Sequence, residues 1–218
     1  MNNAYVVAAL RTAGGRRGGL LANWHPVDLG AQVINALLKE IDCPPDVIED
    51  VIMGSVSQIG EQAMNVARNI VLASQLPESV PATSVDRQCG SSQQALHFAA
   101  QAVMSGSMDV VVAGGVESMT RTPMFSTTTL PQNNGMGHYM SPNLQKRYPN
   151  VEFSQFNGAE MLVKRYGLSR RQLDEFALES HRRAAEAHKH DAFKNEIVSI
   201  EVKDALGNST GEPHDADQ

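Results

Sequence analysis

The residue of this 218-residue chain that is best placed for chemistry is Cys89. It follows residues 82–88, which have the composition of a strand, and precedes residues 91–104, which we expect to form a helix. Unpaired N–H groups and the helix dipole put partial positive charge at a helix N-terminus, which favours the thiolate form of a cysteine. Since a thiolate is a nucleophile, the pattern predicts covalent catalysis at Cys89.

The residues around Cys89 support this prediction. Gly90 would allow a substrate to come close to the backbone, and the N–H group of Cys89 would face an oxyanion formed on an attacked carbonyl. A nucleophile on a sharp turn between a strand and a helix is also found in other folds. The alternative interpretation is that Cys89 is a small buried apolar residue, which is the usual role of a free cysteine.

A catalytic thiolate also needs a base or a cationic partner, which is usually histidine. His97 lies two helical turns beyond Cys89, too far along the helix axis to reach the sulfur. His138 lies in an irregular region, where its spacing indicates no role. Three others, His181, His188 and His190, lie on or near a charged helix and are expected to face solvent. No histidine of this chain is therefore predicted to be the base.

Other charged residues give weaker signals. We expect Asp86 and Arg87 to form a buried or interface ion pair, and Glu117, at a strand end, to have a structural role. Residues 159–190 contain seven basic and five acidic side chains, which are typical of a mixed, solvated helix face. The alternative for some of the basic residues is contact with the phosphates of a nucleotide-bearing substrate.

Composition narrows the function classes. The net charge of −6 argues against a general nucleic-acid binder, and 42% hydrophobic residues can build a core. Cys43 and Cys89 have no zinc or C-x-x-C spacing, so we expect free thiols and no metal site. The sequence has neither a signal-peptide pattern at its start nor an apolar stretch as long as a membrane span. We therefore expect a cytoplasmic protein that does not cross a membrane.

The hydrophobic pattern alternates between strands and helices up to residue 118. We expect strands at residues 4–10, 51–56, 82–88 and 108–113, and helices at residues 28–41, 64–76 and 91–104. The last of these helices has almost no polar face and is predicted to be buried. This alternation is typical of an α/β domain with a largely parallel sheet.

The chain changes character after residue 118. Residues 119–157 show no clear period and are interpreted as an irregular excursion. Ser169 and Gln172 fit a capping box at the start of an amphipathic helix. Residues 198–202 alternate like a strand, whereas residues 207–213 are polar and turn-rich and are expected to be an open end.

Two segments carry a family resemblance. Residues 85–95, Val-Asp-Arg-Gln-Cys-Gly-Ser-Ser-Gln-Gln-Ala, resemble the nucleophile segment of the thiolases, the acetyl-CoA acyltransferases. Residues 114–120, Gly-Gly-Val-Glu-Ser-Met-Thr, resemble the G-G-x-E-S-M segment of the same family. Shorter matches occur in the family order at residues 11–14, 26–29, 158–160, 166–170 and 180–181.

The resemblance implies a reaction. Cys89 would take an acyl group from an acyl-CoA or 3-ketoacyl-CoA as a thioester, and a second substrate, CoA or acetyl-CoA, would then be acylated. CoA and acyl-CoA would be substrates, with no tightly bound cofactor and no metal. The resemblance also implies a homodimer or homotetramer formed through the N-terminal domain, and no nucleic acid as partner.

The resemblance also implies a domain organisation. Residues 1–118 would form a layered α-β-α N-terminal core with a mostly parallel mixed sheet, and residues 119–218 part of an inserted loop domain. The family's His base and second Cys lie in G-H-P and C-x-G-x-G motifs of a C-terminal domain. Neither motif occurs here, and Cys43 cannot replace the second Cys, so this chain alone is expected to have little or no activity.

The sequence departs from the thiolase pattern at one place, and two other functions are compatible with it. Gln155 and Phe156 stand where many thiolases have Met-Gly in the wall of the acyl pocket, so the sequence assigns neither a chain length nor substrate-binding residues. The chain could instead be a non-catalytic, thiolase-like carrier of lipid or acyl-CoA, or a structural dimerisation partner.

Overall fold

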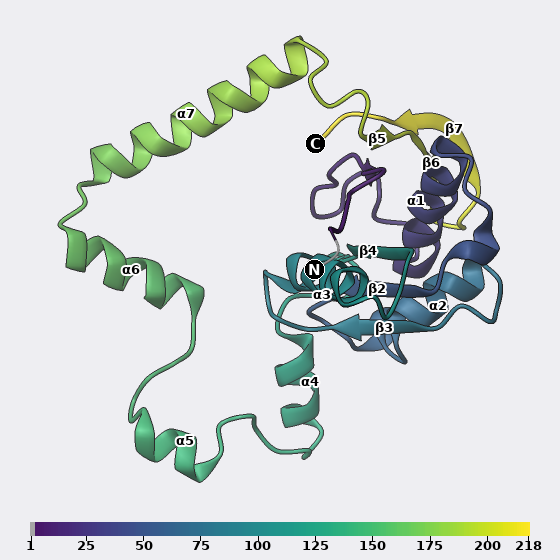
Figure 1. Cartoon of the computed structure of the whole chain (residues 1–218). Helices are drawn as coiled ribbons and strands as arrows, with labels where there is room; N and C mark the ends of the chain where they lie inside the picture. The colour runs from purple at the N-terminus through teal and green to yellow at the C-terminus, as the bar shows by residue number, and fades with distance from the viewer. Residues whose placement is uncertain (1–2) are drawn as a thin grey trace. The chain divides into compact units, whose positions relative to one another are not determined.

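The structure, a computed structural model, describes residues 3–218 and contains a parallel three-stranded sheet (Figure 1). Its strands are β2 (Asp50–Gly54), β3 (Ala82–Val85) and β4 (Val111–Gly115), in the order β3-β2-β4. Gly54, the last residue of β2, is paired with Val85 on one side and with Gly115 on the other. The carboxyl ends of the three strands therefore meet at one edge of the sheet.

Helices cover both faces of this sheet. They are α1 (Pro26–Glu40), α2 (Val66–Ala73) and α3 (Ser91–Ser105), with short 3-10 turns η1 (Pro45–Val47) and η2 (Gly60–Gln62). Val51 and Met53 of β2 belong to the apolar cluster with α1 and α2, whereas Ile52 packs with α3. Successive strand side chains point to opposite faces, so this alternation makes three layers. The predicted α/β fold with a largely parallel sheet is confirmed, as are its helices α1, α2 and α3.

The chain divides into two compact units. A core unit comprises Met1–Leu130 and Asn195–Gln218, and a helical unit comprises Pro131–Lys194. The boundary expected after residue 118 separates a thiolase core from an inserted loop domain. The two compact units do not test it, so it stays a prediction. No helix within residues 3–218 is both long and apolar enough to cross a bilayer.

The strand expected at residues 4–10 is wrong. Only β1 (Arg11–Thr12) is extended and paired there, in parallel with β5 (Ile197–Val198). Tyr5, Val6 and Val7 are exposed. A strand needs a hydrogen-bonding neighbour, and among the described residues none pairs with this apolar stretch.

The open end expected at residues 207–213 is also wrong. Residues Ser209–His214 form β7, which pairs in antiparallel fashion with β6 (Ile200–Lys203). Beyond β7, the Asp217 carboxylate binds the Arg11 guanidinium through two bonds of 2.6 and 3.0 Å. Local polarity could not reveal this docking, because the partners are 206 residues apart in sequence.

The remaining helices are α4 (Ser126–Asn133), α5 (Pro142–Arg147), α6 (Gln155–Tyr166) and α7 (Arg170–Lys189). The irregular excursion expected at residues 119–157 thus contains α4, α5 and the start of α6. The capping box of Ser169 and Gln172 is confirmed at the start of α7. Glu179 forms exposed ion pairs with Arg182 and Arg183, as expected for a solvated face.

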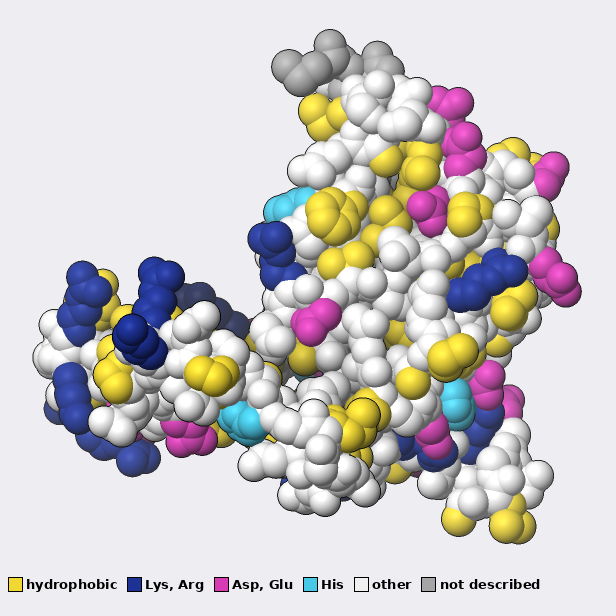
Figure 2. Space-filling model, turned by 90° about the horizontal axis from the view of Figure 1, so that it is seen from below, with side chains coloured by type: hydrophobic (Ala, Val, Ile, Leu, Met, Phe, Trp, Pro, Cys, Tyr) yellow, Lys and Arg dark blue, Asp and Glu magenta, His cyan; other side chains and the backbone are white. Residues whose placement is uncertain are grey.

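One helix is less buried than its sequence predicts. Ala95 and Ala99 of α3 are buried against the sheet, but Leu96 is 48% exposed and Phe98 is 41% exposed. Hydrophobic side chains also reach the surface elsewhere, between charged ones, as Figure 2 shows for one face. The nearly complete lack of polar residues in α3 predicts that all of its faces are buried. Within residues 3–218, only the face of α3 that packs on the sheet is covered.

Packing between α1 and α2 generates a stability prediction. Ile70 is fully buried, and a Cβ atom on Gly30 would lie 2.6 Å from its Cδ1 atom. We expect Ile70→Ala to lower the free energy of unfolding by about 2–5 kcal/mol, because it leaves a cavity between two helices. The matched control Leu72→Ala, on the exposed side of α2, should change it by less than about 0.5 kcal/mol. Equal losses in urea unfolding would contradict this packing.

Candidate active site

Cys89 lies in a short turn between the end of β3 and the start of α3. It is exposed, and the next residue, Gly90, is the N-cap of α3. The strand–turn–helix position predicted from the sequence is therefore observed, whereas the buried alternative for Cys89 is not. Within residues 3–218 no group accepts a hydrogen bond from the Cys89 backbone N–H. The thiol and this N–H group are both available to a ligand.

The turn has an unusual backbone. Gln88 has a φ of 49°, in the left-handed region that is uncommon for residues other than glycine. Asp86 Oδ1 accepts a hydrogen bond of 2.8 Å from the Gln88 N–H group. The expectation of a buried ion pair of Asp86 with Arg87 is wrong, whereas that of an interface ion pair stays a prediction. Both side chains are exposed, and the Asp86 carboxylate binds the main chain of the turn instead.

Two glycines at the sheet edge hold the start of α3. A Cβ atom on Gly54 would overlap the Ser91 carbonyl carbon and the Ser92 nitrogen, and would lie 2.7 Å from Ser92 Cα. A Cβ atom on Gly115 would overlap Ser92 Oγ and lie 2.8 Å from the Gly54 carbonyl oxygen. The α3 backbone therefore rests directly on Gly54 and the Ser92 side chain rests on Gly115, with no space for a side chain on either glycine. This contact fixes the position of the start of α3, and with it that of Cys89, relative to the carboxyl ends of β2 and β4.

Glu117 holds the loop that follows β2. Its carboxylate accepts hydrogen bonds from Val56 N at 2.7 Å, Ser57 N at 3.2 Å and Gln62 Nε2 at 2.9 Å. Gln62 is fully buried and its Oε1 accepts from Ser118 N at 2.7 Å. The structural role expected for Glu117 is therefore observed. Its partner Gln62 was missed, because a glutamine in a loop carries no distinctive sequence signal.

An ion pair joins the same loop to the segment after β4. The Arg121 guanidinium binds both oxygens of Glu61, with Nη2 2.6 Å from Oε1, and donates to the Ala22 carbonyl oxygen at 3.2 Å. The hydrogen bond from Arg121 lowers the pKa of Glu61 below its ordinary value of 4.5. These bonds therefore crosslink the loop at residues 56–62 to the segment at residues 117–121, next to the sheet edge that carries Gly54 and Gly115 (the glycine edge).

The three histidines of the core unit, His25, His97 and His214, form no hydrogen bond or ion pair with Cys89 within the described residues. His25 caps α1 through Nδ1, and His214 is buried with Nε2 3.2 Å from the Ala13 carbonyl oxygen. In the same described part, no group of three His, Cys, Asp or Glu side chains could hold a metal.

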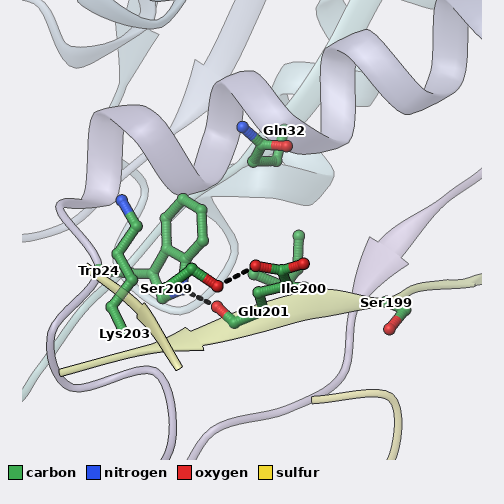
Figure 3. A pocket seen from close by; sticks show the side chains of 7 residues that line it. All are labelled: Trp24, Gln32, Ser199, Ile200, Glu201, Lys203 and Ser209. Atoms are coloured by element: carbon green, nitrogen blue, oxygen red, sulfur yellow. Dashed lines mark hydrogen bonds between the residues drawn. The ribbon is translucent and has the colours of Figure 1, made fainter. Parts of the chain in front are cut away.

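Cys89 lines neither of the following two cavities of the core unit. The first, of about 310 Å³, is shown in Figure 3. Lys203 Nζ lies 3.7 Å from the centroid of the Trp24 ring, and Ser209 Oγ donates to the Glu201 carboxylate. Its charged groups are therefore already engaged within the fold. The second, of about 220 Å³, is an apolar groove between α1, β1 and the end of β4.

The glycine edge can be tested by adjacent substitutions. We expect Gly115→Ala to lower the free energy of unfolding by about 1–3 kcal/mol, because the new methyl group overlaps α3 and the β2 carbonyl. Gly114→Ala is the matched control, since its Cβ would lie at an ordinary 3.6 Å from Met53 Sδ. Urea unfolding measures both. A loss for Gly114→Ala as large as that for Gly115→Ala would contradict the close contact at position 115.

The Glu61–Arg121 pair gives a pH prediction. Because the pKa of Glu61 is lowered in the folded protein, its ionised form stabilises the fold above pH 4.5, and this contribution is lost as the pH falls through the lowered pKa. We expect Glu61→Gln to lower the unfolding free energy at pH 7 by about 1 kcal/mol or less. The difference from the unsubstituted protein should vanish well below pH 4.5.

A control for this titration is Glu212→Gln, since Glu212 is exposed and forms no ion pair within the described residues. It should show no such pH-dependent difference. A loss in Glu61→Gln that is the same at pH 7 and pH 3 would contradict the ion pair.

Comparison with known proteins shows the family of this chain. A model of the thiolase N-terminal domain matches residues 4–217. A steroid 3-ketoacyl-CoA thiolase of Mycobacterium tuberculosis, FadA6, is 47% identical over 205 residues, 93% of this chain and 50% of the relative. A 3-ketoacyl-CoA thiolase of Bacillus subtilis is 39% identical over the same shares of the two chains. One of Shewanella loihica is 40% identical over 95% of this chain and 51% of its own length.

These matches also define what the chain represents. It spans about half the length of the curated relatives that it matches. The match includes the segment of Cys89 and the G-G-x-E-S-M segment, whose residues meet at the edge of the sheet. The chain belongs to the thiolase family and has the fold of its N-terminal domain.

Proposed function

We propose that this chain supplies the nucleophile of a thiolase-type acyltransferase, and that Cys89 carries the acyl group as a thioester. The observation that carries this proposal is the exposed Cys89 thiol beside its own unbonded N–H group, at the N-terminus of α3. Partial positive charge at a helix N-terminus favours a thiolate and also an oxyanion. Both charges arise in acyl transfer to cysteine.

The Cys89 thiol and N–H are sufficient for the first step, the transfer of the acyl group to the enzyme. The Cys89 thiolate attacks the thioester carbonyl carbon of an acyl-CoA, and the carbonyl electrons move to oxygen, where the Cys89 N–H donates to the oxyanion. When this intermediate collapses, the bond to the CoA sulfur breaks and CoA leaves as a thiolate. With a 3-ketoacyl-CoA, the attack is at C3, the C2–C3 bond breaks, and acetyl-CoA leaves after C2 takes a proton.

The second half of the reaction needs groups outside these residues. A base must deprotonate the incoming CoA thiol or the acetyl-CoA carbon, and an acid must protonate the leaving carbon. Since no histidine of the core unit bonds to Cys89 in the described structure, we propose that this chain alone can be acylated but turns over little or not at all. The substrate class we propose, 3-ketoacyl-CoA, follows the names of the relatives.

Further properties of the whole protein follow the family. We propose that it acts without a tightly bound cofactor, as a homodimer or homotetramer formed through the core unit. The unpaired thiols of Cys43 and Cys89 suit a reducing compartment, so we place it in the cytoplasm.

Acylation can be tested directly. On incubation with acetyl-CoA, intact-mass measurement should find one acetyl group per chain in the unsubstituted protein and in Cys43→Ala, and none in Cys89→Ala. An acetyl group that persists in Cys89→Ala would contradict the assignment of the nucleophile. Absence of acetylation from all three folded proteins would support the alternative, a non-catalytic carrier or dimerisation partner.

A further inference from the structure

A buried hydroxyl lies inside the turn that presents Cys89. Ser91 is the first residue of α3 and is only 4% exposed. Its Oγ accepts a hydrogen bond of 2.9 Å from Arg87 N and donates one of 2.6 Å to the Gln88 carbonyl oxygen. The two bonded groups belong to the residues immediately before Cys89. The Ser91 side chain therefore crosslinks the two ends of the turn.

This crosslink acts where the backbone is strained. The left-handed Gln88 costs about 1–3 kcal/mol and persists only if the surrounding contacts impose it. Three contacts converge there: the Asp86 carboxylate on the Gln88 N–H, and the Ser91 N–H and hydroxyl on the Gln88 carbonyl. The Ser91 hydroxyl also satisfies Arg87 N–H, which would otherwise lose its only partner within the described residues.

The start of the helix cannot move to compensate for a lost crosslink. The Ser91 carbonyl carbon and the Ser92 nitrogen already touch Gly54, and Ser92 Oγ touches Gly115. Ser91 is thus held from below by the sheet while its hydroxyl holds residues 87 and 88 from above. Loss of the Ser91 hydroxyl would therefore let the backbone of the turn move while the helix stays in place. The orientation of the Cys89 thiol and N–H would then no longer be fixed.

We propose that Ser91 is a positioning residue: its buried hydroxyl fixes the turn so that the Cys89 thiol and N–H face the acyl carbonyl together. The role in acyl transfer rests on the proposed function above, whereas the orientation of the thiol does not. Ser91 touches no reacting atom. It acts through the main chain of Arg87 and Gln88.

The test compares substitutions that differ only in the hydroxyl group. Ser91→Thr keeps the hydroxyl, and Ser91→Val has the same shape without it, so any cost of overpacking is shared by the pair. Ser91→Ala is the simpler deletion. Ser105→Ala is the control at the other end of α3, where Ser105 Oγ is hydrogen-bonded to the Ala102 carbonyl oxygen at 2.8 Å and to Ser107 Oγ at 2.5 Å.

The first readout is the rate at which iodoacetamide alkylates Cys89, divided by the rate at Cys43 in the same chain. Cys43 is half-buried beside Pro44 and reports general loosening of the fold. We expect the ratio to fall about two- to fivefold in Ser91→Ala and in Ser91→Val, the size of a lost first-turn interaction. Ser91→Thr and Ser105→Ala should keep the ratio of the unsubstituted protein.

The second readout is the rate of acetylation by acetyl-CoA. Since acyl transfer needs the carbonyl aligned with both thiol and N–H, we expect it to fall about 10- to 100-fold in Ser91→Val and to be rescued in Ser91→Thr. Equal alkylation ratios in Ser91→Thr and Ser91→Val would overturn the inference. If no protein is acetylated but the ratio still depends on the hydroxyl, the proposed function fails and the positioning role stands.

Discussion

The contact of the start of α3 with two glycines at the carboxyl edge of the sheet, through its backbone at Gly54 and through the Ser92 side chain at Gly115, is the constraint on which the candidate site depends. Gly54 ends β2 and Gly115 ends β4, and neither leaves space for a side chain below Ser91 and Ser92. Because the helix backbone meets the β2 backbone at Gly54, the position of the start of α3 on the sheet is fixed. Cys89, two residues earlier, is thereby placed just beyond the strand ends, where parallel α/β sheets bind ligands.

Polar crosslinks hold the segments around this contact, in addition to the apolar packing of Val116 in the core. Glu117 binds three N–H groups of the loop after β2, and Arg121 binds Glu61 in the same loop. Such short-range bonds have strict geometry, whereas apolar side chains tolerate shifts. The G-G-x-E-S-M segment thus combines a glycine for the contact with a carboxylate that immobilises its neighbour. Ser91 applies the same principle inside the turn.

Much of this could be predicted from the sequence, because the signals are local. The helices α1 to α3, the strand–turn–helix setting of Cys89 and the capping box of Ser169 all follow from residues adjacent in the chain. What escaped prediction depends on distant partners. The apolar stretch at residues 4–10 has strand composition but no partner strand among the described residues, and the polar stretch at residues 207–213 pairs largely as β7 with β6.

In the candidate site, too, local signals could be predicted from the sequence and contacts made only by the folded chain could not. Cys89 stands out by its motif, but the hydroxyl of Ser91 and the amide of Gln62 act through bonds that only the folded backbone brings together. Asp86 misleads for a related reason. Its neighbour Arg87 suggests an ion pair, yet an exposed aspartate gains more from the nearby N–H of Gln88.

The central claim, that the glycine contact presents the Cys89 thiol and N–H together to an acyl group, is tested most directly by a crystal structure of the protein after reaction with acetyl-CoA. The account predicts an acetyl group on Cys89 Sγ, its carbonyl oxygen within hydrogen-bonding distance of Cys89 N, and Ser91 and Ser92 still in contact with Gly54 and Gly115. An acetylated Cys89 whose carbonyl oxygen points away from this N–H, or a displaced start of α3, would contradict it.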